Sequence, residues 1–183
     1  DAPWRVRWPC EGAPPQPEGR LATAHVAAGQ ALHRLSRAPD AAAHYHAALS
    51  IDAACLPALL GLADLSFDHG DVAQARRGYS KAAMAQPTAA APRARLARLY
   101  HHLGDEANAD ASVVQALTLE PSHAAALEAS AVLHLARGRA LEARDDLVKA
   151  LAARDAPPVG GDRWKAWTCT LASVHEQLGQ RLD

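Results

Sequence analysis

Residues 56–89 read LPALLGLADLSFDHGDVAQARRGYSKAAMAQPTA, and the spacing of small and large residues in this stretch decides the fold. Ala75, Tyr79 and Ala82 recur at i, i+4 and i+7, which places them on one face of a helix. Gly70 lies between two helical patterns, where the chain needs a positive φ, and Pro87 stops the second helix. The stretch therefore predicts two antiparallel helices joined by a short loop.

The same pattern recurs every 34 residues on both sides of this stretch. Each row has a small residue in its first half, a turn residue in the middle and a small–large–small face in its second half. The rows align without a gap, so we expect four helix pairs over residues 21–157, in the repeats 22–55, 56–89, 90–123 and 124–157. The three columns hold Gly29, Ala63, Ala97 and Ala131; Ser36, Gly70, Gly104 and Gly138; and Tyr45, Tyr79, Val113 and Leu147 between alanines.

These rows resemble the tetratricopeptide repeat family, whose period and glycine, alanine and proline positions they share. They depart from the family in the tryptophan column, which holds His25, Leu59, Arg93 and Leu127, and in the turn residue of the first row, Ser36. The resemblance implies an all-α fold. It further implies an α-solenoid of antiparallel helix pairs, wound as a right-handed superhelix, with four full repeats and a C-terminal helix.

The segments outside the rows differ from them. Residues 1–20 are rich in proline, and Trp4, Val6 and Trp8 share one face if this segment is extended. We expect an extended arm that packs on the array itself or docks on a partner through its two indoles, with disorder as a third alternative. Residues 158–183 predict a loop and then a helix at about 163–180. That helix is either a natural cap or the first half of a fifth repeat cut from a longer array.

The composition narrows the class of protein. Alanine, the best helix former, makes up 45 of the 183 residues, and aromatic residues make up 4%, so an all-β fold is excluded. Lys and Arg number 19 against 20 Asp and Glu, so we expect neither a nucleic-acid partner nor an anionic membrane. The chain has no long apolar run, which predicts no membrane insertion. It opens with Asp1, so an exported mature protein and an intracellular fragment both remain open.

The chain lacks the common catalytic and cofactor motifs, including H-E-x-x-H, the P-loop and G-x-S-x-G, so we expect no enzyme and no cofactor. No metal site is predicted either. His44 and His46 are two residues apart on a helix and point to nearly opposite sides, and the adjacent His101 and His102 diverge as well. A metal would need ligands from neighbouring helices. The widely spaced cysteines predict inert thiols.

The resemblance implies that the first helix of each pair lines a concave groove. Packed helices lie about 8–10 Å apart, so we expect Asp64 to reach Arg98, and Asp68 to reach Arg34 or His102. Such pairs are either solvated ion pairs between repeats or part of a surface that binds a partner. The predicted partner-binding residues are Gln30, His33, Arg34, Leu60, Asp64, Phe67, Asp68, Arg95, Arg98, His101, His102, Glu128, Val132 and Leu135.

These expectations combine into a non-enzymatic protein–protein interaction scaffold that binds a peptide or a helix in the groove. The alternative is a structural domain of a larger protein, such as an enzyme or an assembly-complex accessory, with intramolecular contacts. Self-association through the repeat ends is also open. No chaperone tail is expected as a partner. The family's five carboxylate-clamp positions correspond to Val26, Gln30, Gly61, Ala91 and Arg95, of which only Arg95 has the required chemistry.

Overall fold

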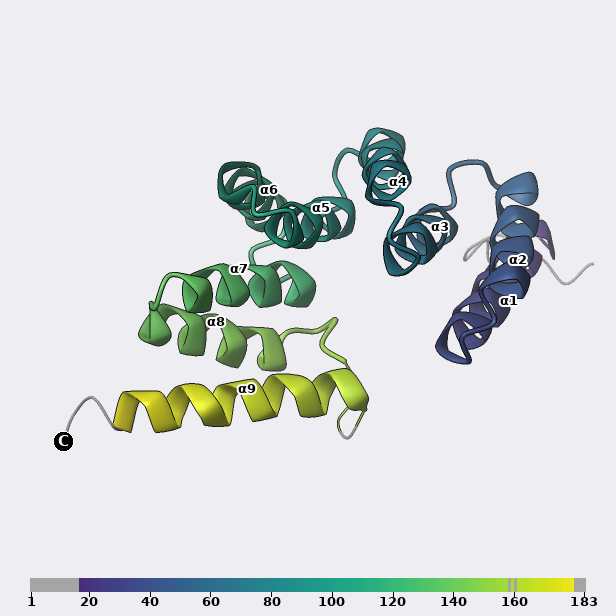
Figure 1. Cartoon of the computed structure of the whole chain (residues 1–183). Helices are drawn as coiled ribbons and strands as arrows, with labels where there is room; N and C mark the ends of the chain where they lie inside the picture. The colour runs from purple at the N-terminus through teal and green to yellow at the C-terminus, as the bar shows by residue number, and fades with distance from the viewer. Residues whose placement is uncertain (1–16, 158, 160, 180–183) are drawn as a thin grey trace, which may run out of the picture. The chain divides into compact units, whose positions relative to one another are not determined.

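The computed structural model describes residues 17–157, 159 and 161–179, and these residues form helices and connecting turns without a strand (Figure 1). This confirms the predicted all-α fold. The helices are α1 (Pro17–Arg34), α2 (Ala38–Ile51), α3 (Leu56–Asp68), α4 (Val72–Ala85), α5 (Ala91–His102), α6 (Glu106–Leu119), α7 (Ala124–Ala136), α8 (Ala140–Ala152) and α9 (Asp162–Gly179).

The chain divides into two compact units, residues 1–61 and residues 62–183. The N-terminal unit holds α1, α2 and the first part of α3. The C-terminal unit holds the rest of α3 and the helices α4 to α9. Each unit is described separately below.

The turn inside each helix pair has the backbone conformation that the sequence predicts. Gly70, Gly104 and Gly138 have φ values of 80°, 73° and 70°, in the left-handed region where glycine carries no steric penalty. Ser36 occupies the same position in the first pair with φ 58°. A residue with a Cβ atom therefore adopts the turn that glycine makes in the other three pairs.

The second helix of each pair buries the face that the small–large–small columns predict. On α4 this face consists of Ala75, Tyr79 and Ala82, all buried. The small alanines let the neighbouring helices approach, and the large residue fills the space between them. The corresponding buried residues are Ala41, Tyr45 and Ala48 on α2, Ala109, Val113 and Ala116 on α6, and Ala143, Leu147 and Ala150 on α8.

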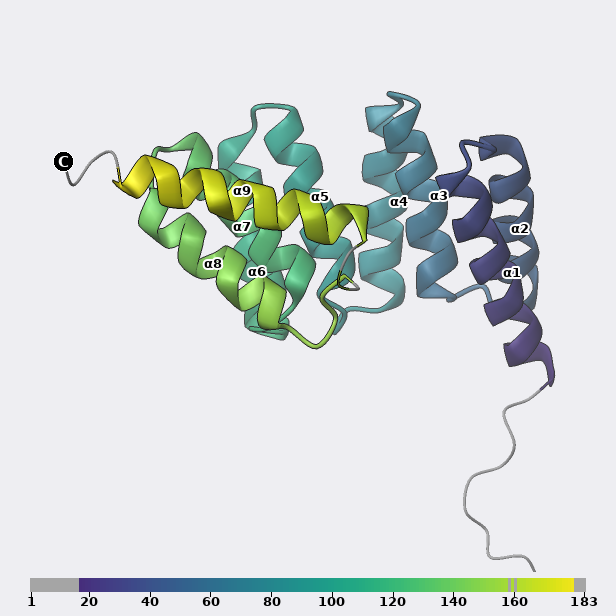
Figure 2. The same ribbon diagram turned by 90° about the horizontal axis from the view of Figure 1, so that it is seen from below.

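In the C-terminal unit, α9 packs along α8 and completes the apolar core beside α7 (Figures 1 and 2). Trp167 is buried against Ala124, Leu127 and Ala150. The connection before α9 is also fixed, because the backbone N–H of Ala124 donates to the carboxylate of Asp155 at 2.9 Å. Together these contacts hold the first turn of α9 next to α7.

The first helix begins earlier than the predicted arm allows. The arm was expected to extend to residue 20 because its prolines oppose a helix, but α1 starts at Pro17. Proline is tolerated in the first turn of a helix, where its missing N–H would have no intrahelical partner. Trp4, Val6 and Trp8 lie outside the described residues.

Candidate functional site

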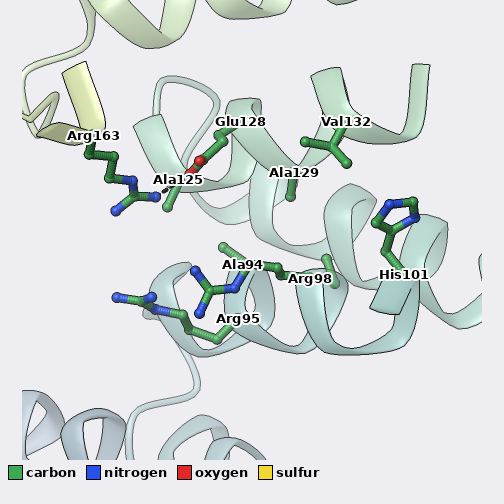
Figure 3. Close-up of a pocket in the computed structure, with 10 residues that line it drawn as sticks. Ala94, Arg95, Arg98, His101, Ala125, Glu128, Ala129, Val132 and Arg163 are labelled. Carbon is green, nitrogen blue, oxygen red and sulfur yellow. Dashed lines mark hydrogen bonds and ion pairs between the residues drawn. The ribbon is translucent and has the colours of Figure 1, made fainter. Parts of the chain in front are cut away.

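A hollow opens on the C-terminal unit between α5, α7 and the first turn of α9 (Figure 3). The unfilled space between its lining side chains, counted out into the open solvent, is about 410 Å³. Small side chains form its floor, since alanines on α5 and α7 leave space between these helices. We call it the arginine hollow. Its lining residues are Ala94, Arg95, Ala97, Arg98 and His101 on α5, Ala125, Glu128, Ala129 and Val132 on α7, and Arg163 on α9.

Two of the arginines share a single carboxylate. Asp64 on α3 lies 3.4 Å from Arg95 and 3.8 Å from Arg98, measured between guanidinium nitrogen and carboxylate oxygen. The contact between Asp64 and Arg98 is the one that the repeat register predicts. The same carboxylate accepts a hydrogen bond of 2.6 Å from the Tyr79 hydroxyl. The buried Tyr79 side chain therefore fixes the position of the Asp64 carboxylate, which also faces two guanidinium groups.

Aromatic rings support the guanidinium of Arg98. Its carbon lies 5.3 Å from the centre of the Phe67 ring, within the range of a cation–π contact. The Phe67 ring in turn meets the edge of His102, with ring centres 5.4 Å apart. Phe67 and His102 were both predicted as groove residues; Phe67 contacts Arg98, and His102 contacts Phe67.

The third arginine comes from α9. Arg163 forms an ion pair with Glu128 of α7 (Figure 3). Its guanidinium carbon lies 5.1 Å from the centre of the Trp167 ring. Arg163 was not predicted as a site residue, because it lies in the helix that follows the fourth repeat, outside the four aligned rows. The proline and glycine residues just before it mark a loop and the start of a helix, but they do not indicate which neighbouring helix its first turn contacts.

The remaining predicted residues are not among those that line the arginine hollow. Leu135 packs against the cluster of Ala131, Ala143 and Leu147 between α7 and α8, and Leu171 of α9 packs against the same cluster. Asp68 is exposed at the C-terminal end of α3. In the N-terminal unit, Gln30 and Arg34 are exposed on α1, His33 is half-buried on α1 and Leu60 is half-buried on α3.

One histidine pair in the N-terminal unit was not predicted. His25 on α1 and His44 on α2 place their Nδ1 atoms 2.9 Å apart, so one imidazole donates a hydrogen bond to the other. The columns of the repeat could not show this, because the two residues belong to different helices of one pair. Within the described ranges, no group of three or more His, Cys, Asp or Glu side chains is arranged to hold a metal ion.

The hydrogen bond between Tyr79 and Asp64 gives a stability prediction. Tyr79→Phe is expected to lower the free energy of unfolding at neutral pH by about 1.5–3 kcal/mol, the typical contribution of a hydrogen bond to a charged group. Urea unfolding followed by far-UV circular dichroism measures the change. An unchanged midpoint would show that the bond contributes nothing to stability.

The same bond makes stability depend on alkaline pH. Burial raises the pKa of Tyr79 well above its usual value, and the nearby charge of Asp64 and the bond to it raise it further. Because folding raises this pKa, the protonated tyrosine stabilises the folded state. The contribution is fully present below the unfolded pKa of about 10 and is lost as the pH rises toward the folded pKa. The difference in unfolding free energy between wild type and Tyr79→Phe should therefore shrink above about pH 10.

Comparison with known proteins supports the repeat architecture. Residues 92–123, which span α5 and α6, match the family model of the tetratricopeptide repeat. No curated protein matches this sequence. In the described part of the chain, no helix combines the length and the apolar character that a membrane crossing requires.

Several solved structures share the fold, which confirms the predicted α-solenoid. A chain in the crystal structure of the APC/C heterotetramer Cut9–Hcn1 superposes with a TM-score of 0.73 at 20% identity, over 90% of this chain and 31% of that chain. A thermophilic TPR protein of Thermus thermophilus gives a TM-score of 0.69 at 20% identity, over 86% and 83%. PilF of Pseudomonas aeruginosa gives 0.68 at 16% identity, over 90% and 72%.

Proposed function

We propose that this chain, which is a tetratricopeptide-repeat protein, binds a segment of a partner protein in the arginine hollow of its C-terminal unit. Its fold is in general a scaffold for protein–protein interaction. One observation carries the choice of site. The hollow combines an alanine floor, the exposed apolar side chain of Val132 and several charged side chains on three helices of one unit.

The hollow has the chemical composition that segment binding requires. A bound segment gains affinity from a few anchors in a preformed recess, while charged groups at the edge set its register. Val132 and the alanines supply apolar surface, and the arginines with Glu128 supply the polar edge. The helices that form the hollow are fixed by buried clusters, so little ordering entropy opposes binding.

A steric block of the hollow tests this proposal. Peptides are first selected from a random displayed library on the folded wild-type chain. Val132→Trp places a large neutral side chain in the hollow, and we expect it to weaken binding of the selected peptides by about tenfold or more, or 1.4 kcal/mol. The readout is fluorescence anisotropy with the purified full chain.

The matched control makes the same substitution elsewhere. Val114 is exposed on α6 and lies outside the hollow, so Val114→Trp should leave peptide affinity unchanged. Both variants should keep the far-UV circular dichroism of the wild type, because both side chains are exposed. Equal peptide affinity of the Val132→Trp variant and the wild type would place the binding surface elsewhere and overturn the proposal.

The length of one structural neighbour bears on the source of the segment. This chain covers 31% of the matching chain in the Cut9–Hcn1 structure. An array of this fold can thus match one part of a longer polypeptide. If the segment that fills the hollow belongs to the same polypeptide, the array serves as a structural domain. Selected peptides would then resemble a segment of the full-length protein, whereas a scaffold would select unrelated sequences.

A further inference from the structure

We infer that the arginine hollow selects an acidic segment of a partner protein. This inference rests on the proposed function and specifies the chemistry of the partner. The three guanidinium groups of Arg95, Arg98 and Arg163 line one recess, and they come from two helices, α5 and α9, that are separated in the sequence by three others.

The cationic groups of the hollow face solvent more than the anionic ones do. The side chains of Arg95, Arg98 and Arg163 are 26%, 44% and 40% exposed, whereas those of Asp64 and Glu128 are 16% and 25% exposed. Each guanidinium group is therefore more exposed than the carboxylate with which it is paired. An incoming chain meets positive charge first, and charge complementarity favours an acidic one.

Asp64 does not use all the N–H donors of Arg95 and Arg98. Asp64 already accepts the Tyr79 hydroxyl at 2.6 Å. Its separations of 3.4 Å and 3.8 Å from Arg95 and Arg98 are longer than a charge-assisted hydrogen bond of about 2.7–2.9 Å. A guanidinium group carries five N–H donors in a planar fork that matches a carboxylate. Arg95 and Arg98 can therefore bind a second carboxylate without breaking a short bond to Asp64.

Two of the guanidinium groups are held in place before a ligand arrives. Arg98 lies over the ring of Phe67 and Arg163 over the ring of Trp167. Stacking on a ring restricts a long side chain and lowers the entropy that binding must remove. Arg163 stands on the opposite side of the hollow from Arg95 (Figure 3). Ala94 and Ala125 lie near these arginines, whereas Val132 lies at the other end of the hollow, toward His101 (Figure 3).

A nucleic acid also carries negative charge, but the observations favour a protein segment. The chain as a whole has a net charge of −1, so it lacks the basic excess that phosphate backbones require. The hollow is floored by alanine, and its lining residues include no Phe, Tyr or Trp ring on which a base could stack.

Three labelled peptides of one design test the inference. Each is a dodecapeptide with the same leucine and alanine residues, and the other positions are all Glu, all Gln or all Lys. Binding to the full chain is measured by fluorescence anisotropy at low and at physiological salt. We expect the Glu peptide to bind at least about tenfold more tightly than the Gln peptide, and its affinity to fall as salt rises. The Lys peptide should bind least tightly.

Charge-neutralising variants locate the effect. Arg98→Gln and Arg163→Gln should each weaken the Glu peptide by about fivefold to tenfold and leave the Gln peptide unchanged. Arg76→Gln and Arg77→Gln are the matched controls, because these arginines are exposed on α4 and lie outside the hollow. Neither control should change the affinity of any peptide.

The outcomes separate this inference from the proposed function. Equal affinity of the Glu and Gln peptides would overturn the acidic preference, and binding of library peptides blocked by Val132→Trp would still support the hollow as a site. If the Glu peptide binds equally to wild type and Arg98→Gln, the arginines do not select it and the inference fails. Displacement of the Glu peptide by a single-stranded oligonucleotide at equal charge concentration would replace the acidic segment with a nucleic acid.

Discussion

Gly61→Ala is expected to destabilise the N-terminal unit by about 3 kcal/mol, the upper part of the range for overpacking a core. A Cβ atom at this position would lie 2.4 Å from Cζ of Tyr45 and 2.6 Å from Cε1. Carbon atoms in contact are normally about 3.5–4.0 Å apart. The substitution therefore requires either the ring or the helix to move.

The ring of Tyr45 is confined by its surroundings and cannot easily shift away from a Cβ atom at position 61. It is almost fully buried, and a Cβ atom at Gly29 would lie 2.7 Å from its Cε1. The two glycines thus hold the ring from α1 and from α3. The expected sign is unusual, because alanine in a helix interior is otherwise about 1 kcal/mol more stable than glycine.

Urea unfolding by far-UV circular dichroism measures this effect. Gly19→Ala is the matched control, since it lies in α1 and a Cβ atom there would meet nothing within 4 Å. We expect the control to be neutral or slightly stabilising. The double variant Gly61→Ala with Tyr45→Leu should recover part of the loss if the clash is its cause. A Gly61→Ala chain as stable as the wild type would contradict the close approach.

The repeat architecture could be predicted from the sequence because each column has a local physical cause. A turn with positive φ selects glycine at Gly70, Gly104 and Gly138, and a buried helix face selects the spacing of Ala75, Tyr79 and Ala82. The need for glycine at position 61 could not be predicted this way. It follows from the size of Tyr45 on another helix, and the other rows carry different residues in that column.

The candidate site could be predicted only in part. The register between neighbouring repeats gave the contact of Asp64 with Arg98, since equivalent positions of adjacent first helices face each other. Arg163 depends on how the connection after α8 directs α9, and Asp155 fixes that connection through the backbone of α7. The pair of His25 and His44 depends on the relative height of two helices. The direction of α9 and the relative axial position of α1 and α2 are not encoded by residue types that recur from repeat to repeat.

Trp167→Ala is expected to destabilise the C-terminal unit by about 3–5 kcal/mol, the usual cost of removing a buried aromatic ring. Trp167 is 3% exposed and anchors α9 on α7 and α8. Trp164 is only half-buried on the same helix, so Trp164→Ala is the matched control and should lose much less stability. The variants are compared by urea unfolding and by hydrogen exchange of the α9 amides.

The indole nitrogen of Trp167 adds a second expectation. It is buried without a hydrogen-bond partner among the described residues, a state that costs about 1–3 kcal/mol. Trp167→Phe keeps an aromatic ring and removes the unpaired N–H, so it should retain most of the stability that Trp167→Ala loses. The alanine variant also removes the ring beneath Arg163, and we expect it to weaken peptide binding in the hollow. Wild-type protection of the α9 amides in Trp167→Ala would contradict this role, because α9 would then be held by other contacts.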